Sequence, residues 1–175
     1  MSQQSIETKR LILRRFNLSD ATRVQELAGD KRIAEMTANI PHPYKNGMAE
    51  GWIRTHCDLW ELKQSVIYAI TLKDSGQLIG AISLTEITAN DGNLGYWLGV
   101  PFWGKGYCTE ASLALVEFAF KHLQLPMLYA RHLPENSPSG SVILKSGFSY
   151  RYDVEVTASG KVRKVRHYEL QRKHI

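Results

Sequence analysis

Hydrophobic and polar residues follow two kinds of spacing along this chain, and the change between them separates predicted strands from predicted helices. Alternation comes first, over residues 8–16. There Leu11 and Leu13 fall on one side of an extended chain and Ile12 on the other, because successive side chains of a strand point to opposite faces. This segment is therefore predicted to form a half-buried strand.

Apolar residues at intervals of three and four predict helices in four later segments. In the clearest of these, Ala111, Leu115, Phe118 and Ala119 share one face, the stripe expected where a helix packs against a sheet. The last predicted helix ends at Gly147, a residue type that commonly closes helices. The four predicted helices cover residues 21–28, 47–63, 109–122 and 136–146.

Six further strands are predicted from runs rich in β-branched and aromatic residues bounded by turn residues. Short turns at residues 74–76, 90–92 and 158–161 join consecutive strands and predict antiparallel pairing. The strand, helix and strand between residues 94 and 131 predict one parallel pair, since such a crossover returns the chain in the same direction. These six strands cover residues 66–72, 78–87, 94–100, 127–131, 148–157 and 162–171.

The elements together predict an α+β fold, in which a mostly antiparallel twisted sheet of about seven strands is covered by about four helices. A length of 175 residues fits a single domain over residues 1–175 and is large enough to bury a core. The N-terminal sequence lacks the apolar segment of a secretory signal, and no apolar run approaches the ~20 residues that span a bilayer. We therefore expect a cytoplasmic location.

Cysteine and charge patterns exclude some functions. Cys57 and Cys108 have neither a disulfide framework nor metal-ligand spacing, so no metal site is expected. The chain carries 22 Lys and Arg residues against 17 Asp and Glu residues, a net charge of +5, and residues 161–175 alone supply that excess. We favour a solvated strand face there; the alternative is a patch for an anionic partner such as RNA.

A glycine-containing turn before the helix at 109–122 is the best candidate for a functional site. Gly104 and Gly106 lack a Cβ atom, so the backbone can turn tightly and approach a ligand. The first amides of the helix have no intrahelical acceptor and, with the helix dipole, suit a pyrophosphate. Taken alone, the turn fits a plain connection, a P-loop or a coenzyme A site. The P-loop fits poorly, because Gly106 stands where a Mg²⁺-binding Ser or Thr should follow Lys105.

Three segments together resemble the GNAT superfamily of acetyltransferases, in the form found in RimJ/RimL-type N-terminal acetyltransferases. GYWLGVPFWGKGYCTEA at 95–111 is similar to the acetyl-CoA motif of that family, and PENSPSGSVILKSGF at 134–148 to its second signature. TKRLILRRF at 8–16 resembles its first strand. The resemblance covers essentially the whole chain and implies the GNAT fold, with the parallel pair splayed around the cofactor.

The resemblance also implies acetyl-CoA as cosubstrate and assigns roles to particular residues. Ser139 would lie near the sulfur and protonate the departing thiolate, with Tyr129 and Tyr107 as weaker alternatives. Asn136 would bond the pantetheine arm, although an asparagine there is also a common helix N-cap. Amides at 98–100 would stabilise the oxyanion. The residues implied to contact acetyl-CoA through main-chain groups are Leu98, Gly99, Val100, Gly104, Lys105, Gly106, Tyr107, Cys108 and Thr109.

The sequence departs from the family pattern at three positions. Trp103 stands where Gln or Arg is usual, and Cys108 stands where Gly or Ala is usual. A thiol at a helix N-terminus would be acidic and oxidisable, which suggests a redox sensor. Asn93 occupies a position where related enzymes can carry a glutamate base. The best carboxylate left for the base is Glu86, on the neighbouring strand.

The implied reaction is direct attack of a primary amine on the acetyl thioester. At pH 7 an α-amine costs about 1.4 kcal/mol to deprotonate and a lysine about 4.6 kcal/mol, so a site with a weak base favours α-amines. A protein N-terminus is therefore the expected acceptor, and the family type implies a ribosomal protein. Small amines, polyamines and aminoglycosides are alternative acceptors. Alternatives of another class are a CoA-binding regulatory module without turnover and an RNA- or ribosome-binding domain, and the assembly is a monomer or a homodimer.

Overall fold

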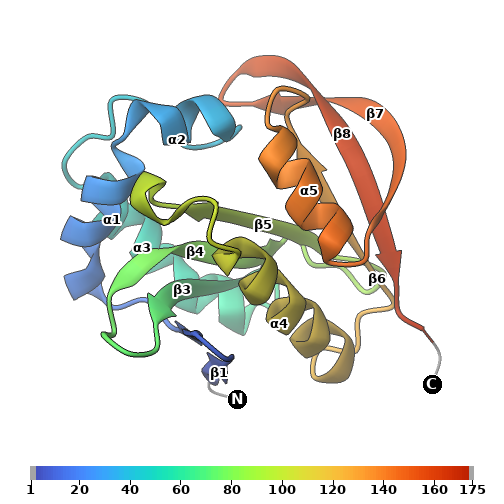
Figure 1. Ribbon diagram of the computed structural model, residues 1–175, viewed down its shortest axis with the longest axis horizontal. Coiled ribbons are helices and arrows are strands. Elements are labelled where there is room, and N and C mark those ends of the chain that lie inside the picture. The colour runs from blue at the N-terminus through green and yellow to red at the C-terminus, as the bar shows by residue number, and fades with distance from the viewer. Residues whose placement is uncertain (1–2, 174–175) are drawn as a thin grey trace.

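One mixed sheet runs through the molecule, with helices on both of its faces (Figure 1). The computed structural model describes residues 3–173. The sheet has eight strands in the order β1-β2-β3-β4-β5-β6-β8-β7. The strands are β1 (Ile6–Glu7), β2 (Leu11–Arg14), β3 (Val66–Leu72), β4 (Leu78–Thr85), β5 (Asn93–Leu98), β6 (Met127–His132), β7 (Ser149–Ala158) and β8 (Lys161–Gln171). The α-helices are α1 (Ala21–Ala28), α2 (Lys31–Met36), α3 (Met48–Glu61), α4 (Tyr107–Lys121) and α5 (Ser137–Lys145).

The β5–β6 pair is the one place in the described sheet where neighbouring strands run parallel. Its pairing is short: Asn93 lies opposite Tyr129 and Leu94 opposite Ala130, and no further pair follows. Beyond Leu94 the two strands are no longer paired, so their carboxyl ends splay into a wedge. The predicted α+β class and the single parallel pair are both confirmed.

The face of the sheet under α4 and α5 carries the larger core. Ala111, Leu115 and Ala119 are fully buried and form the apolar stripe of α4 that the sequence predicts. They pack in one cluster with Leu94 and Leu98 of β5, which point to the same side of the sheet. The strand that forms one wall of the wedge is therefore anchored from one face by α4.

A second, smaller core fills the opposite face, between the sheet and helices α1 and α3. Val24 of α1 and Ile53 of α3 are buried there, and Trp97 of β5 packs against the cluster from its own side of the strand. The side chains of β5 thus divide between the two cores, as its alternating sequence predicts.

Two elements differ from the sequence prediction. The first strand, predicted over residues 8–16, is shortened to β2, because Thr8 and Leu11 exchange main-chain and side-chain hydrogen bonds in a turn. This turn joins β2 in a hairpin to β1, which was not predicted. Helix α2 was not predicted at all. It has six residues and buries only Ile33, so it is too short to show helical periodicity. Its N-cap is Asp30, whose side chain accepts a hydrogen bond from the Arg32 amide.

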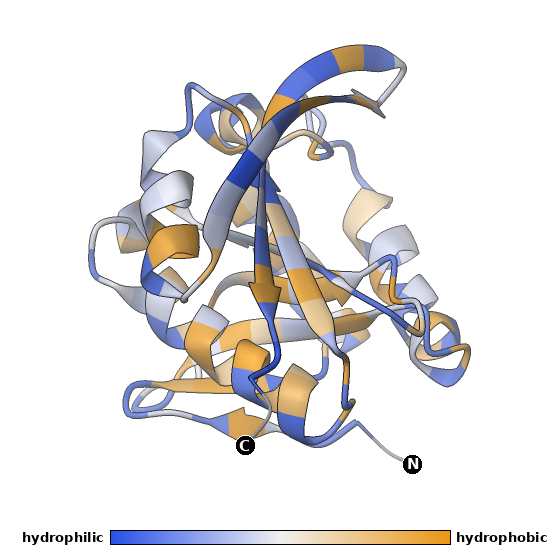
Figure 2. Cartoon of the chain, turned by 90° about the vertical axis from the view of Figure 1, so that its right-hand side faces the viewer, coloured by the Kyte–Doolittle hydropathy of each residue, from blue (hydrophilic) through white to orange (hydrophobic). Residues whose placement is uncertain are grey.

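The β7–β8 hairpin carries the basic segment. Figure 2 shows hydrophilic residues along its outer part, where it arches above the rest of the molecule. Lys161, Lys164 and Arg166 are exposed, and Lys164 lies 3.3 Å from the Asp153 carboxylate on the paired strand. These exposures agree with a solvated strand face. Separately, none of the helices within residues 3–173 is long and apolar enough to cross a bilayer.

Two glycines give a matched test of the packing. A Cβ atom at Gly80 in β4 would lie 2.2 Å from the Trp97 carbonyl oxygen and 2.9 Å from the Leu98 Cα atom, both backbone atoms of β5. Gly80→Ala should therefore lower the free energy of unfolding by about 1–3 kcal/mol or more. Gly51, inside α3, has open space around it, so Gly51→Ala should raise that free energy by about 0.5–1 kcal/mol. Urea unfolding measures both, and equal stability of the two variants would contradict the described packing of β4 on β5.

Candidate active site in the wedge between strands β5 and β6

The loop from β5 to α4 is shaped by a side chain and two glycines. The indole N–H of Trp103 donates to the Leu98 carbonyl oxygen at 2.8 Å, closing the loop back onto the end of β5. Gly104 and Gly106 follow with φ angles of 73° and 80°, in the left-handed region that glycine adopts without strain. Helix α4 then begins at Tyr107, two residues earlier than predicted.

The main-chain amides at the end of this loop, from Gly104 to Thr109, are unpaired within the described residues. The first backbone hydrogen bond of α4 runs from the Glu110 amide to the Gly106 carbonyl oxygen, at 3.1 Å. Within residues 3–173, no amide from Gly104 to Thr109 donates to a protein acceptor. A Cβ atom built on Gly104 would have nothing within 4 Å, so the loop is open on that side. Unpaired amides at the positive end of a helix dipole fit a pyrophosphate.

A contact from the β1–β2 turn fixes the direction in which the loop faces. The Glu110 carboxylate accepts three hydrogen bonds of 2.7 Å, from the Thr8 hydroxyl, the Arg10 amide and Arg10 Nε. Arg10 Nη1 donates to the Lys105 carbonyl oxygen at 2.9 Å, and the guanidinium carbon lies 4.5 Å from the centre of the Tyr107 ring. We call this set of contacts the Arg10–Glu110 clamp.

The clamp is electrostatically favourable for the carboxylate. Burial raises the pKa of the Glu110 carboxyl, but the hydrogen bonds from Thr8 and Arg10 and the nearby positive charge outweigh it. The net result is a pKa below the ordinary value of 4.5, so Glu110 is ionised at neutral pH. Because Arg10 binds the Lys105 carbonyl oxygen, the orientation of the Lys105–Gly106 peptide group, and with it of the Gly106 amide, is fixed.

Of the residues expected to stabilise the oxyanion, one is already engaged. The Gly99 amide donates to the Ile79 carbonyl oxygen at 2.8 Å, so it is not free to bind an oxyanion. Gly99 instead permits close packing, since a Cβ atom there would lie 2.7 Å from a methyl group of Leu27 in α1. The Val100 amide has no acceptor within the described residues. The Leu98 amide points to the free edge of β5, because Leu98 lies next to the hydrogen-bonded Gly99 in an antiparallel ladder, where bonded and unbonded pairs alternate.

Ser139, the expected acid, lies beside a tyrosine that the sequence analysis did not select. The hydroxyls of Ser139 and Tyr96 are 2.9 Å apart, and the Tyr96 hydroxyl also lies 3.0 Å from the Ser139 carbonyl oxygen, to which it donates. The Ser139 hydroxyl can therefore donate to Tyr96. Burial strongly raises the pKa of Tyr96, so the phenol keeps its proton at neutral pH. The pair joins α5 to the middle of β5.

The two alternative acids lie elsewhere. Tyr107 packs beneath the Arg10 guanidinium. Tyr129 of β6 points to the other face of the sheet, where its hydroxyl donates to the Glu86 carboxylate in a short hydrogen bond and its ring stacks on His167. Burial, followed by the contact with Glu86, raises the pKa of Tyr129.

Glu86, the expected base, follows directly after β4 and lies at the paired end of the wedge. It has a φ angle of 51°, an uncommon backbone conformation for a residue other than glycine. The preceding residue, Thr85, pairs with Asn93 at the start of β5. Since Tyr96 is three residues beyond Asn93, the main chain at Glu86 lies roughly 10 Å or more along the sheet from the main chain at Tyr96.

Asn136 is a helix N-cap, the alternative considered for it. Its side-chain oxygen accepts from the Ser139 amide at 3.2 Å, and its side-chain nitrogen donates to the Met36 carbonyl oxygen at the end of α2, at 2.9 Å. One turn on, Gly140 leaves room for a buried imidazole: a Cβ atom there would lie 2.7 Å from His132 Nε2. The start of α5, and with it Ser139, is thus fixed from two sides.

The expectation of an acidic thiol at Cys108 is wrong. The side chain packs against the core under α4, and burial raises its pKa to about 12. Desolvation of the thiolate outweighs the helix dipole, so the thiol is protonated at neutral pH and a poor redox sensor. Within residues 3–173, no group of three or more His, Cys, Asp or Glu side chains could hold a metal ion.

Two functional contacts were missing from the sequence analysis. Tyr96 could have been found, because a tyrosine on the apolar face of a strand needs a partner for its hydroxyl. The Arg10–Glu110 clamp had no local signal, since its residues are 100 positions apart. Both belong to the segments that carry the resemblance to the GNAT superfamily, which the fold brings into contact.

Comparison with known proteins agrees with this geometry. The family model for the acetyltransferase (GNAT) domain matches residues 10–149. The uncharacterized N-acetyltransferase p20 of Bacillus licheniformis is 30% identical over 138 residues, which cover 78% of this chain and 77% of p20. The family match at residues 10–149 includes Arg10 and Glu110 of the clamp and both strands of the wedge.

Solved structures share the fold at lower sequence identity. RimL, the ribosomal L7/L12 α-N-protein acetyltransferase solved in complex with coenzyme A, superposes with a TM-score of 0.85 at 16% identity, covering 96% of this chain and 98% of RimL. The ribosomal-protein-S5-alanine acetyltransferase from Vibrio fischeri gives a TM-score of 0.83 at 19% identity, covering 97% of each chain. The family match and the unpaired amides from Gly104 to Thr109 lead to one conclusion: this chain belongs to the GNAT family and is an N-acetyltransferase that uses acetyl-CoA.

Proposed function

We propose that this enzyme transfers the acetyl group of acetyl-CoA to the N-terminal α-amine of a protein, with a ribosomal protein as the leading candidate. The observation that carries the proposal is the row of unpaired amides from Gly104 to Thr109, held outward by the Arg10–Glu110 clamp. These amides would bind the pyrophosphate, and the splayed strands would receive the pantetheine arm. Two solved structures with this fold, RimL and the S5-alanine enzyme, are named for acetylation of ribosomal proteins.

The proposed reaction is direct attack of the neutral amine on the thioester carbonyl carbon. A carbon–nitrogen bond forms, the carbon–sulfur bond breaks, and the thiolate leaves with the electron pair. The Val100 amide would donate to the oxyanion. The Ser139 hydroxyl would give its proton to the thiolate and regain one from water, while the Tyr96 hydroxyl, which stays protonated at neutral pH, orients it. The proton that the amine nitrogen loses would pass through water to Glu86.

The position of Glu86 supports an α-amine as acceptor. The main chain at Glu86 lies roughly 10 Å or more along the sheet from that at Tyr96, and the carboxylate binds the Tyr129 hydroxyl on the other face, so we expect no direct hydrogen bond to an amine beside the Ser139–Tyr96 pair. Glu86 would act on the amine through water, which makes it a weak base. A weak base suffices for an α-amine, whose deprotonation at pH 7 costs about 1.4 kcal/mol, but not for a lysine at about 4.6 kcal/mol.

The direct experiment compares acceptors. Acetyl transfer to peptides with a free N-terminus should exceed transfer to matched Nα-blocked peptides with one lysine by over a hundredfold in kcat/KM, the ratio that the two deprotonation costs imply. Glu86→Gln should slow transfer to lysine more than transfer to the α-amine. Preference for lysine would overturn the acceptor, and equal losses for both acceptors would remove Glu86 as base.

Gly106→Glu tests the cofactor loop. The substitution places a negative charge and a side chain where the pyrophosphate would bind, so calorimetry should show loss of coenzyme A binding. Gly160→Glu is the matched control, because Gly160 has a similar φ angle of 73° in the β7–β8 turn and open space around it. Unaltered affinity in Gly106→Glu would contradict the proposed phosphate site.

Ser139→Ala and Tyr96→Phe test the proposed acid. Each should lower kcat, Ser139→Ala by roughly a hundredfold, while the KM for acetyl-CoA changes little. The double variant should be no slower than Ser139→Ala, since the two hydroxyls act as one unit. Tyr150→Phe, which removes an exposed hydroxyl on β7, serves as the control. Additive losses in the double variant would argue against a coupled pair.

A further inference from the structure

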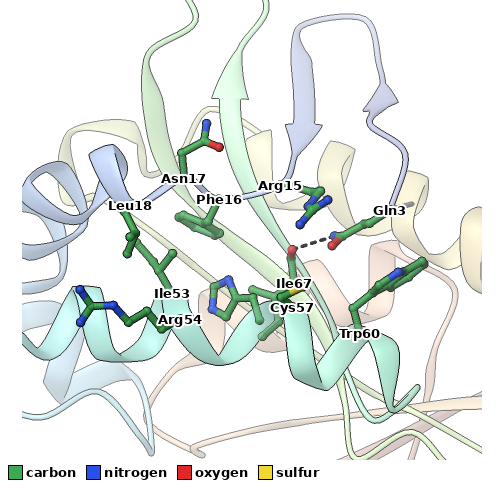
Figure 3. A pocket seen from close by; sticks show the side chains of 11 residues that line it. Gln3, Arg15, Phe16, Asn17, Leu18, Ile53, Arg54, Cys57, Trp60 and Ile67 are labelled. Carbon is green, nitrogen blue, oxygen red and sulfur yellow. Dashed lines mark hydrogen bonds between the residues drawn. The ribbon is translucent and has the colours of Figure 1, made fainter. Parts of the chain in front are cut away.

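A second cavity lies on the α3 face of the sheet, near the edge formed by β1 and β2. It has a volume of about 300 Å³ and opens between α3 and the segment that follows β2 (Figure 3). Its lining shares no residue with the wedge, the cofactor loop or α5. The lining residues are Gln3, Arg15, Phe16, Asn17, Leu18, Ile53, Arg54, His56, Cys57, Trp60 and Ile67.

His56 has two buried ring nitrogens that find no hydrogen-bond partner within residues 3–173. Its ring meets the rings of Phe16 and Trp52 edge-on, with centroids 5.3 Å and 4.5 Å away. Burial lowers the pKa of His56 to about 4, so the imidazole is neutral at pH 7, with one N–H donor and one acceptor. Leaving such groups unpaired costs about 1–3 kcal/mol each, which a polar ligand would offset.

The two charged side chains that line the cavity are both arginines, although the Glu61 carboxylate lies 3.8 Å from Sγ of the lining residue Cys57. Arg15 and Arg54 line it, both exposed, and neither has an ion-pair partner within residues 3–173. The lining includes no Asp or Glu side chain. In Figure 3 the Arg15 guanidinium lies above Ile67, whose carbonyl oxygen accepts from the Gln3 side chain at 2.9 Å, whereas Arg54 points outward at the other end. An anion is the ligand that this arrangement favours.

The walls restrict the shape of that anion. Phe16, His56 and Trp60 supply three flat rings, so a planar group would gain more contact than a branched one. A volume of about 300 Å³ is at the low end for ligand pockets. The space suits one ring with its charged group and is too small for a nucleotide.

We propose that this cavity binds a small planar organic anion, an aromatic ring that bears a carboxylate. Arg15 binds the carboxylate, Phe16 and Trp60 contact the ring, and the His56 imidazole supplies a second polar contact. The site is separate from the acetyl-CoA wedge and does not depend on the identity of the amine acceptor.

Benzoate is a suitable probe, and the four tryptophans of the chain report where it binds. Its titration should shift the indole N–H resonance of Trp60, assigned with Trp60→Phe, in a saturable manner. The resonance of Trp103, whose indole N–H closes the cofactor loop, should not move. Both results should be unchanged with saturating coenzyme A. Displacement by coenzyme A, or a shift at Trp103, would place benzoate in the wedge and overturn the proposal.

Variants separate a built site from a nonspecific charge effect. Arg15→Gln should weaken benzoate binding at least about tenfold, since a charged hydrogen bond is lost. Arg166→Gln removes an exposed arginine of β8 and should leave the affinity unchanged. His56→Phe should also weaken binding while stability is kept or raised, because it replaces unpaired nitrogens with an apolar ring of similar shape. Equal effects of Arg15→Gln and Arg166→Gln would overturn the proposal.

Inorganic phosphate tests the planar part of the assignment, because it has the charge without the ring. It should bind at least about tenfold more weakly than benzoate, since it forfeits the aromatic contacts. Equal or tighter binding of phosphate would overturn the planar class. An absence of saturable benzoate binding up to about 100 mM would overturn the site itself, since that affinity is within reach of a ligand of this size.

Discussion

The proposed cofactor site depends on one contact, in which the Glu110 carboxylate and the Lys105 carbonyl oxygen both bind Arg10. A loop of glycines before a helix can turn its amides either to a ligand or to protein acceptors. Arg10 limits this freedom, because it binds the Lys105 carbonyl oxygen and so fixes the orientation of the Lys105–Gly106 peptide group. The hairpin of β1 and β2, a peripheral element by its position at the sheet edge, is therefore expected to control the shape of the proposed phosphate site at the start of α4.

The wedge follows from a balance of forces on β5. Leu94 and Leu98 hold one face of this strand against α4, and Trp97 holds the other against α1 and α3. The antiparallel ladder to β4 fixes one edge, while the parallel edge to β6 is paired at only two positions. The strand is thus rigid on three sides and free on the fourth. Such a rigid free edge suits a site that must hold a thioester in a fixed orientation.

Local spacing made much of this predictable. The glycines of the loop and the stripe of α4 come from patterns a few residues apart, and the parallel pair follows from the order of strand, helix and strand, so the sequence predicts all three well. The coupling of Tyr96 to Ser139 joins residues 43 positions apart, and the Arg10–Glu110 clamp joins residues 100 apart, so spacing carries no information on either. The prediction for Cys108 was wrong for another reason: its thiol packs against the core, where the cost of desolvating a thiolate outweighs the effect of the helix N-terminus.

The side chain of Asn136 links the two halves of the active site. Its side-chain oxygen caps the N-terminus of α5, the helix that carries Ser139. Its side-chain nitrogen donates to the carbonyl oxygen of Met36, the last residue of α2, and the loop to α3 follows. A displacement of α2 by an arriving polypeptide would pull on the same amide that orients Ser139. Acceptor docking and proton delivery would then be mechanically coupled, and the enzyme would gain a means to suppress futile hydrolysis of its thioester while no acceptor is present.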